Sequence, residues 1–117
     1  LYYPYHIDAD LLNGEAQSFV GMHDFSAFCA AGSSVESKVR TLKNASVIRN
    51  NEIVEFTFEA DGFLYNMVRI MVGTLLDINR GKIEQGSIPQ IIESKDRNLA
   101  GATAAPDGLY LNRVNYD

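Results

Sequence analysis

Residues 62–76 read Gly-Phe-Leu-Tyr-Asn-Met-Val-Arg-Ile-Met-Val-Gly-Thr-Leu-Leu, and this stretch decides the fold. Its apolar residues recur at helical spacing on two adjoining faces, which predicts a helix over residues 63–78 that is buried on most sides. Tyr65, Arg69 and Gly73 follow one another at intervals of four and form a narrow stripe along this helix. Glycine costs a helix about 1 kcal/mol relative to alanine, so we expect backbone or a ligand to approach Gly73 closely.

Arg69 is the one charged residue in this stretch. An arginine taken out of water must be paired, most naturally with a carboxylate or a phosphate that accepts its planar fork. Two interpretations stay open at this point. Arg69 either forms a structural ion pair inside the fold, which is the commoner arrangement, or belongs to an active site.

The rest of the chain predicts a mixture of helices and strands. Helices are predicted over residues 8–20 and 87–95, the first capped by Asp8 and the second by a capping box that starts at Ser87. The other predicted segments are one helical turn within 21–28, strands over 39–48, 53–60 and 109–116, a loop over 97–108 and a candidate edge strand over 1–5.

This order of elements predicts a single α+β domain over residues 1–117. It consists of an antiparallel sheet covered by helices on one face, in the split βαβ, or ferredoxin-like, arrangement. Within residues 53–60, apolar and polar side chains alternate, which is typical of a sheet that has one face in water.

Composition restricts the classes of function. The chain has 117 residues, 46% of them hydrophobic, which suits one globular domain with a real core. No uncharged apolar run reaches the roughly 18 residues that a membrane span needs, because Arg69 interrupts the best candidate. The single cysteine, Cys29, excludes an internal disulfide and a cysteine-based zinc site and fits a reducing cytoplasm. We therefore predict neither a membrane span nor a metal site.

Charge gives a mixed indication about nucleic acid. The formal net charge is −5, from 15 acidic and 10 basic side chains, which argues against nucleic-acid binding through bulk electrostatics. Lys38, Arg40 and Lys43 nevertheless form a local basic cluster. This cluster is either an ordinary solvated surface or a set of phosphate contacts.

Six short words occur in an order found in a known family. They are His-Asp-Phe-Ser-Ala-Phe at 23–28, Val-Arg-Thr at 39–41, Gly-Phe-Leu-Tyr-Asn-Met-Val-Arg at 62–69, Val-Gly-Thr-Leu-Leu at 72–76, Lys-Asp-Arg at 95–97 and Ala-Pro-Asp-Gly-Leu-Tyr-Leu at 105–111. Each word is weak alone, but six in register make coincidence improbable. Over residues 8–116 the chain resembles the C-terminal domain of the tRNA pseudouridine synthase A family.

The resemblance implies an enzyme that isomerises uridine to pseudouridine in the anticodon stem-loop of tRNA, without a cofactor. In the family the catalytic aspartate lies in an N-terminal domain, within a Gly-Arg-Thr-Asp word, and this word does not occur here. We therefore expect residues 1–117 to be the C-terminal half of such an enzyme, inactive without the N-terminal domain. The resemblance also implies a cytoplasmic homodimer that grips tRNA.

The resemblance assigns candidate site residues one by one. Arg69 matches the family's active-site arginine, which pairs with the catalytic aspartate and keeps it ionised. Leu109 matches the hydrophobic residue that lines the uracil pocket, and Gly108 would let the chain pass close to the base. Tyr65, on the stripe of Arg69, is placed with these substrate-binding residues.

RNA binding can be interpreted in two ways. Because the target base is stacked in the RNA, it must be flipped out to reach an enzyme cleft, and Lys38 and Arg40 are the candidate contacts to tRNA phosphates. The competing hypothesis is a free-standing ferredoxin-like module that binds RNA or dimerises. An RNA-recognition module needs a strand of the Arg/Lys-Gly-Phe-Gly-Phe-Val type with stacking aromatics, and the sequence contains none.

Two further groups favour structural roles. His23, Asp24 and Ser26 have the residue types of a catalytic relay, but neighbours on one short turn do not easily form one, so capping and packing are preferred. Arg97, next to Asp96, is interpreted as tying down a loop.

Overall fold

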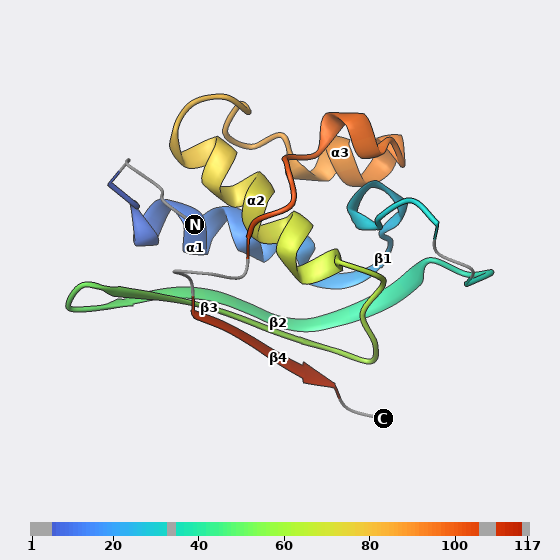
Figure 1. The fold of residues 1–117 in the computed structure, drawn as a ribbon, viewed down its shortest axis with the longest axis horizontal. Coiled ribbons are helices and arrows are strands. Elements are labelled where there is room, and N and C mark those ends of the chain that lie inside the picture. The colour runs from blue at the N-terminus through green and yellow to red at the C-terminus, as the bar shows by residue number, and fades with distance from the viewer. Residues whose placement is uncertain (1–5, 33–34, 106–109, 116–117) are drawn as a thin grey trace.

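The computed structural model describes residues 6–32, 35–105 and 110–115. Its helices lie on one face of a four-stranded sheet, and the opposite face is not covered by any described element (Figure 1). In chain order the elements are α1 (Ala9–Ala16), η1 (Gln17–Phe19), β1 (Gly21–Asp24), η2 (Ser26–Phe28), β2 (Val39–Asn50), β3 (Ile53–Ala60), α2 (Met67–Asn79), α3 (Ile88–Ser94), η3 (Arg97–Leu99) and β4 (Tyr110–Asn115), where η marks a 3₁₀ turn.

The strands lie side by side in the order β1-β2-β3-β4. β2 and β3 pair antiparallel, as predicted, with a register shift between Leu42 and Asn44, and β1 also pairs antiparallel with β2. β4 instead pairs parallel to β3, so the prediction of an antiparallel sheet is wrong for this strand. β3, α2 and β4 therefore form a βαβ unit, in which the helix crosses over between two parallel strands. The α+β class with helices on one face is confirmed.

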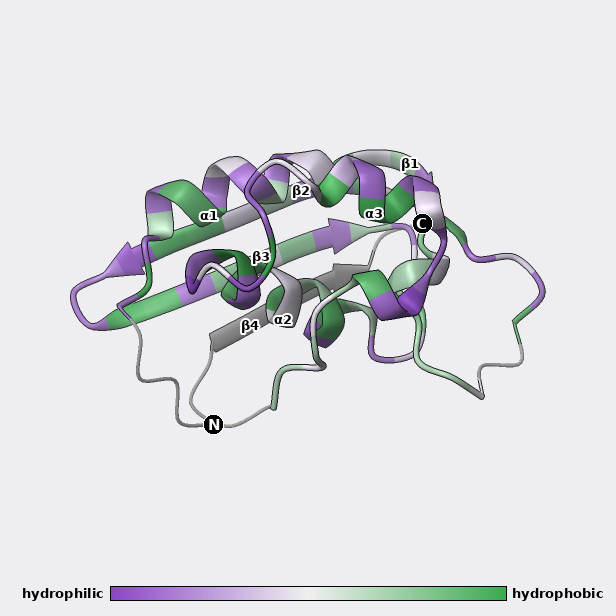
Figure 2. Ribbon diagram, turned by 90° about the horizontal axis from the view of Figure 1, so that it is seen from above, coloured by the Kyte–Doolittle hydropathy of each residue, from purple (hydrophilic) through white to green (hydrophobic). Residues whose placement is uncertain are grey.

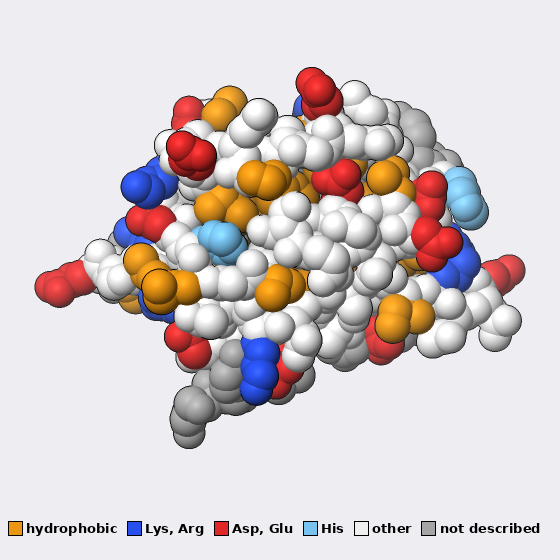
Figure 3. All heavy atoms as spheres, turned by 180° about the vertical axis from the view of Figure 1, so that it is seen from behind, with side chains coloured by type: hydrophobic (Ala, Val, Ile, Leu, Met, Phe, Trp, Pro, Cys, Tyr) orange, Lys and Arg blue, Asp and Glu red, His pale blue; other side chains and the backbone are white. Residues whose placement is uncertain are grey.

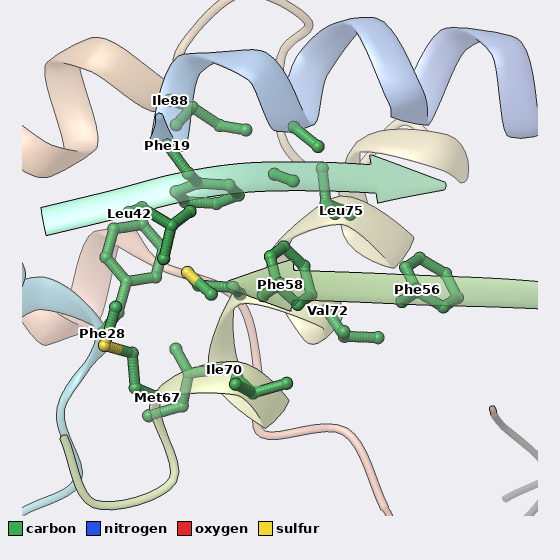
Figure 4. Close-up of a cluster of buried hydrophobic side chains, with 14 of the residues drawn as sticks. Phe19, Phe28, Leu42, Phe56, Phe58, Met67, Ile70, Val72, Leu75 and Ile88 are labelled. Carbon is green, nitrogen blue, oxygen red and sulfur yellow. The ribbon is translucent and has the colours of Figure 1, made fainter. Parts of the chain in front are cut away.

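The core lies between the sheet and the helices. Phe56 and Phe58 of β3 are fully buried and point towards α2, where Ile70 and Leu75 are also fully buried (Figure 4). The predicted alternation of β3 is confirmed, because its apolar series faces this core. Burying one such side chain stabilises the fold by about 1.5–3 kcal/mol. Figure 2 shows the hydrophobic and hydrophilic residues alternating along β3 beneath the helices.

The segment 21–28 differs from its prediction. Gly21 to Asp24 form a strand, β1, because they pair with β2, and only Ser26–Phe28 make the predicted helical turn. That turn does bury the rings of Phe25 and Phe28. The strand was missed because four residues carry little pattern of their own, and the partner strand defines them.

The long helix α2 begins at Met67 rather than at residue 63. Asn66 has φ 58° and ψ 13°, the left-handed conformation, so the helix cannot extend backwards through it. Tyr65 consequently lies before the helix and not on its stripe.

Three smaller predictions can also be compared with the structure. Asp8 caps α1 as predicted, accepting a hydrogen bond from Leu11 N at 3.1 Å. The capping box at Ser87 is wrong, because its hydroxyl donates to Glu84 O at 2.6 Å and does not cap α3. The candidate edge strand over residues 1–5 lies outside the described residues. None of the helices in the described part of the chain has the length and apolarity needed to cross a membrane.

Candidate active-site wall

Arg69 lies in the first turn of α2 and is partly buried. Its Nε donates to Ala104 O at 3.2 Å, and its Nη1 makes a long contact of 3.5 Å with Asn66 Oδ1. No carboxylate among the described residues pairs with it. The structural ion pair considered from the sequence is therefore not found in the described part of the chain. A guanidinium has five N–H donors, and three of those of Arg69 have no acceptor among the described residues.

A short segment, residues 100–104, lies directly against α2, and we call it the strap (Figure 1). A Cβ atom added at Gly73 would lie 1.6 Å from Ala102 O, and one added at Gly101 would lie 2.7 Å from Thr74 Cα. Both glycines are needed because backbone meets backbone at this point. The close approach predicted at Gly73 is thus confirmed, and backbone makes it.

Hydrogen bonds hold the strap on both sides. Thr74 Oγ1 accepts from Gly101 N at 2.9 Å and donates to Ile70 O at 2.8 Å, which satisfies this fully buried hydroxyl. On the other side, Arg97 Nη1 donates to Gly101 O at 2.8 Å. The loop-tying role interpreted for Arg97 is confirmed.

The strap also fixes Arg69. Ala104 N donates to Arg69 O at 2.9 Å, while Ala104 O accepts from Arg69 Nε, so one residue engages both the backbone and the side chain of the arginine. Because Nε already donates to Ala104 O, a planar anion binds best to the edge of the guanidinium that carries Nη1 and Nη2.

The other predicted substrate-binding residues can be placed only in part. Tyr65 is 62% exposed, and its carbonyl accepts a hydrogen bond from Ala30 N at 3.0 Å. Its ring is therefore accessible next to the first turn of α2. Gly108 and Leu109 lie outside the described residues, between the strap and β4.

The two candidate phosphate contacts lie at the start of β2. Arg40 Nη1 donates to Ser37 O at 2.9 Å and to Val39 O at 2.7 Å, and its stem packs over Gly62. Lys38 O accepts from Phe25 N at 2.9 Å. Neither contact tests RNA binding, so both assignments stay predictions.

His23, Asp24 and Ser26 form a turn and not a relay. Asp24 Oδ1 accepts from the backbone and the hydroxyl of Ser26, while His23 Nε2 contacts Val20 O at 3.0 Å. The hydrogen bond from the Ser26 hydroxyl lowers the pKa of Asp24, and the positive charges of Lys95 and Lys38 add to this. Capping, the preferred interpretation, fits this geometry.

Asn66 and Thr74 have roles in the fold that their sequence surroundings do not indicate. An asparagine just before an apolar run can indicate a helix boundary, but nothing local shows that its side chain turns to Arg69. Thr74 stands among apolar residues in the sequence, and only its distant partner Gly101 reveals its role. The described residues contain no group of three or more His, Cys, Asp or Glu side chains able to hold a metal ion.

These features define a class: an α+β domain in which a partly buried arginine is held by backbone and has no carboxylate partner among the described residues. A sequence model described as tRNA pseudouridine synthase matches residues 16–117. The chain is 50% identical over 116 residues to the tRNA pseudouridine synthase A of Acetivibrio thermocellus, covering 96% of this chain and 48% of that protein. For the proteins of the same name from Geobacillus sp. and Streptococcus suis, identity is 45% and 48%, over 99% of this chain and 47% of each relative.

The chain therefore belongs to the tRNA pseudouridine synthase family. It spans about half the length of the curated relatives it matches.

Proposed function

We propose that this chain forms one wall of the active site of a tRNA-uridine isomerase, which converts uridine to pseudouridine in the anticodon stem-loop. Arg69 pairs with a catalytic aspartate that lies in the N-terminal domain of the same protein. The observation that carries the proposal is the guanidinium, which is held by Ala104 and yet has donors that no described residue accepts. Family membership supports the reaction class.

The chemistry assigned to Arg69 follows from its surroundings. A carboxylate brought against an apolar wall tends to become protonated, because burial disfavours the charged form. A fixed cation opposes that tendency and orients the carboxylate towards the flipped base. No cofactor is required for this step.

The proposed substrate contacts are Tyr65, Gly108 and Leu109. The exposed ring of Tyr65 is available to stack on a base, which is worth about 1–3 kcal/mol in protein complexes with single-stranded nucleic acid. Leu109 lines the uracil pocket, and Gly108 leaves space for the base.

The experiment combines the chain with the N-terminal half of a full-length relative, such as the one from Acetivibrio thermocellus, and an anticodon stem-loop RNA. Tritium release from 5-labelled uridine reports the reaction, because the new bond forms at C5. We expect turnover with both parts and none with the chain alone. Arg69→Ala should lower turnover at least a hundredfold while largely sparing RNA affinity. Arg80→Ala is the matched control, since Arg80 caps the other end of α2 and pairs there with Asp77 at 3.2 Å.

Turnover by the chain alone, or an equal loss of RNA affinity in Arg69→Ala, would contradict the proposal.

The homodimer and the cytoplasmic location stay predictions. A sedimentation measurement that shows only monomer at high concentration would count against this domain sufficing for dimerisation.

A further inference from the structure

We propose that a hollow on the outer side of the strap binds a phosphate group of the RNA backbone through Arg97 and Thr103. The inference rests on the proposed function, because RNA is the partner. It adds a binding site away from Arg69 and assigns it a chemical class of ligand.

The hollow is defined by backbone and small side chains. It has a volume of about 490 Å³ and is lined by Ala30, Ala31, Arg97, Asn98, Ala100, Gly101, Ala102 and Thr103. No residue of α2 lines it, so it lies on the side of the strap that faces away from the helix. It is open enough for a group attached to a longer chain to enter.

Charge distinguishes this hollow from the rest of the surface. The chain carries a net charge of −5, and Figure 3 shows acidic side chains at several places on one face, together with fewer basic ones. None of the residues that line the hollow is acidic, and one of them, Arg97, is basic. No described carboxylate pairs with Arg97. This partly buried arginine therefore forms no direct ion pair with a described residue.

Arg97 uses only part of its hydrogen-bonding capacity on the strap. Nη1 donates to Gly101 O at 2.8 Å and Nη2 donates to Thr103 Oγ1 at 3.3 Å, which leaves three N–H donors that no described residue accepts. Thr103 Oγ1 acts as the acceptor in that contact, so its own hydrogen stays free to donate.

A backbone donor also faces the hollow. Ala102 O points at α2, as the 1.6 Å distance from a Cβ built on Gly73 shows. In a trans peptide the next N–H points the opposite way, so the N–H of Thr103 points outwards. It makes no hydrogen bond to the described residues. Arginine, hydroxyl and backbone N–H donors are the groups that bind phosphate in proteins.

The surroundings add positive charge. Lys95 lies two residues before Arg97, and Lys95 and Lys38 both lie close enough to Asp24 to act on its carboxylate. Lys95, at the end of α3, and Lys38, just before β2, thus lie near the same carboxylate, which balances one of their two charges, and Arg97 adds a further positive charge two residues after Lys95.

The test measures binding of an anticodon stem-loop RNA to the intact protein at several salt concentrations. One phosphate contact contributes about 0.7–0.9 to the slope of log affinity against log salt. Arg97→Gln should reduce the slope by this amount and weaken binding about tenfold at low salt. Arg97→Lys should restore the slope. Thr103→Val should weaken binding a few-fold without changing the slope.

Two further variants separate RNA binding from positioning. Lys82→Gln removes an exposed lysine beyond the far end of α2, and we expect an unchanged slope. Thr74→Val breaks the opposite tie of the strap without changing charge, so turnover at saturating RNA should fall while the slope stays. An unchanged slope in Arg97→Gln would overturn the inference.

A phosphorus NMR titration with inorganic phosphate distinguishes the source of the ligand. If Arg97→Gln abolishes phosphate binding but leaves the RNA slope unchanged, the hollow takes free phosphate, and the inference is wrong. If the intact protein, without substitutions and with its N-terminal domain, neither binds the stem-loop RNA nor releases tritium, the proposed function itself fails. If Arg97→Gln has normal turnover and an unaltered slope of log affinity against log salt, only the phosphate site is rejected.

Discussion

At the scale of single residues, Asn66 shows how the site depends on an uncharged neighbour. It adopts the left-handed conformation that asparagine tolerates better than most residues. It does not cap α2, although asparagine commonly does so, and instead its Oδ1 lies 3.5 Å from Arg69 Nη1. An amide can orient the guanidinium there and leave its charge available.

Asn66→Asp should therefore lower turnover about tenfold, because a carboxylate at this position would pair with Arg69 and neutralise it. Tritium release measures the effect, with thermal unfolding to confirm the fold. Asn51→Asp is the matched control, since Asn51 has the same φ of 58° in the β2–β3 turn, far from Arg69 in sequence. Equal turnover in both variants would show that Asn66 only forms the turn.

At the scale of elements, the contact between the strap and α2 joins Arg69 to the chain that leads into β4. Gly73 and Gly101 bring the two backbones together, and Thr74 and Ala104 add the hydrogen bonds. Because backbone meets backbone at this contact, no side chain there can change its rotamer to make room. A larger residue at either glycine must therefore move the backbone itself.

Gly73→Ala should destabilise the fold by about 1–3 kcal/mol, because the new Cβ would overlap Ala102 O and overpacking outweighs the gain in helix propensity. Gly14→Ala makes the same substitution in α1, where no atom lies within 4 Å, and should stabilise the fold by about 0.5–1 kcal/mol. Urea unfolding of the two variants should give opposite signs. A stabilised Gly73→Ala would mean that the strap moves away freely.

The sequence predicted those elements whose pattern is local. The alternation of β3, the cap at Asp8 and the close approach at Gly73 all have short-range signatures. β1 and the hydrogen bond between Thr74 and Gly101 have no such local signature, because each depends on a partner that is distant in the sequence. For the candidate site, the sequence indicated Arg69 because it is a lone charge in an apolar helix. Its hydrogen bond to Ala104 O could be found only in the structure.

At the scale of the whole molecule, stability should depend on pH through Asp24. Its pKa is lowered in the fold, first by the hydrogen bond from Ser26, relative to an ordinary value of 3.8. A carboxylate with a lowered pKa contributes stability above its ordinary pKa, and this is lost as the pH falls through the folded-state value.

Asp24→Asn should therefore be less stable than the unaltered chain at pH 7, by about 0.5–1 kcal/mol for a solvent-screened contact. The difference should shrink as the pH falls below about 4. Thermal unfolding across this pH range measures it. Ser26→Ala keeps the carboxylate but removes its hydroxyl donor, and it should show the same trend more weakly. A difference independent of pH would exclude Asp24 as the cause.

The parallel pairing of β4 has a consequence for how the protein is made. β2 and β3 meet through a tight turn and can pair as soon as both have been synthesised, whereas β4 must wait for α2, α3 and the strap. Among the described elements, the hairpin is thus available early and β3 keeps a free edge until the last strand arrives. During that interval the growing chain exposes backbone groups that could pair with a neighbouring molecule, so the order of synthesis leaves a temporary risk of aggregation.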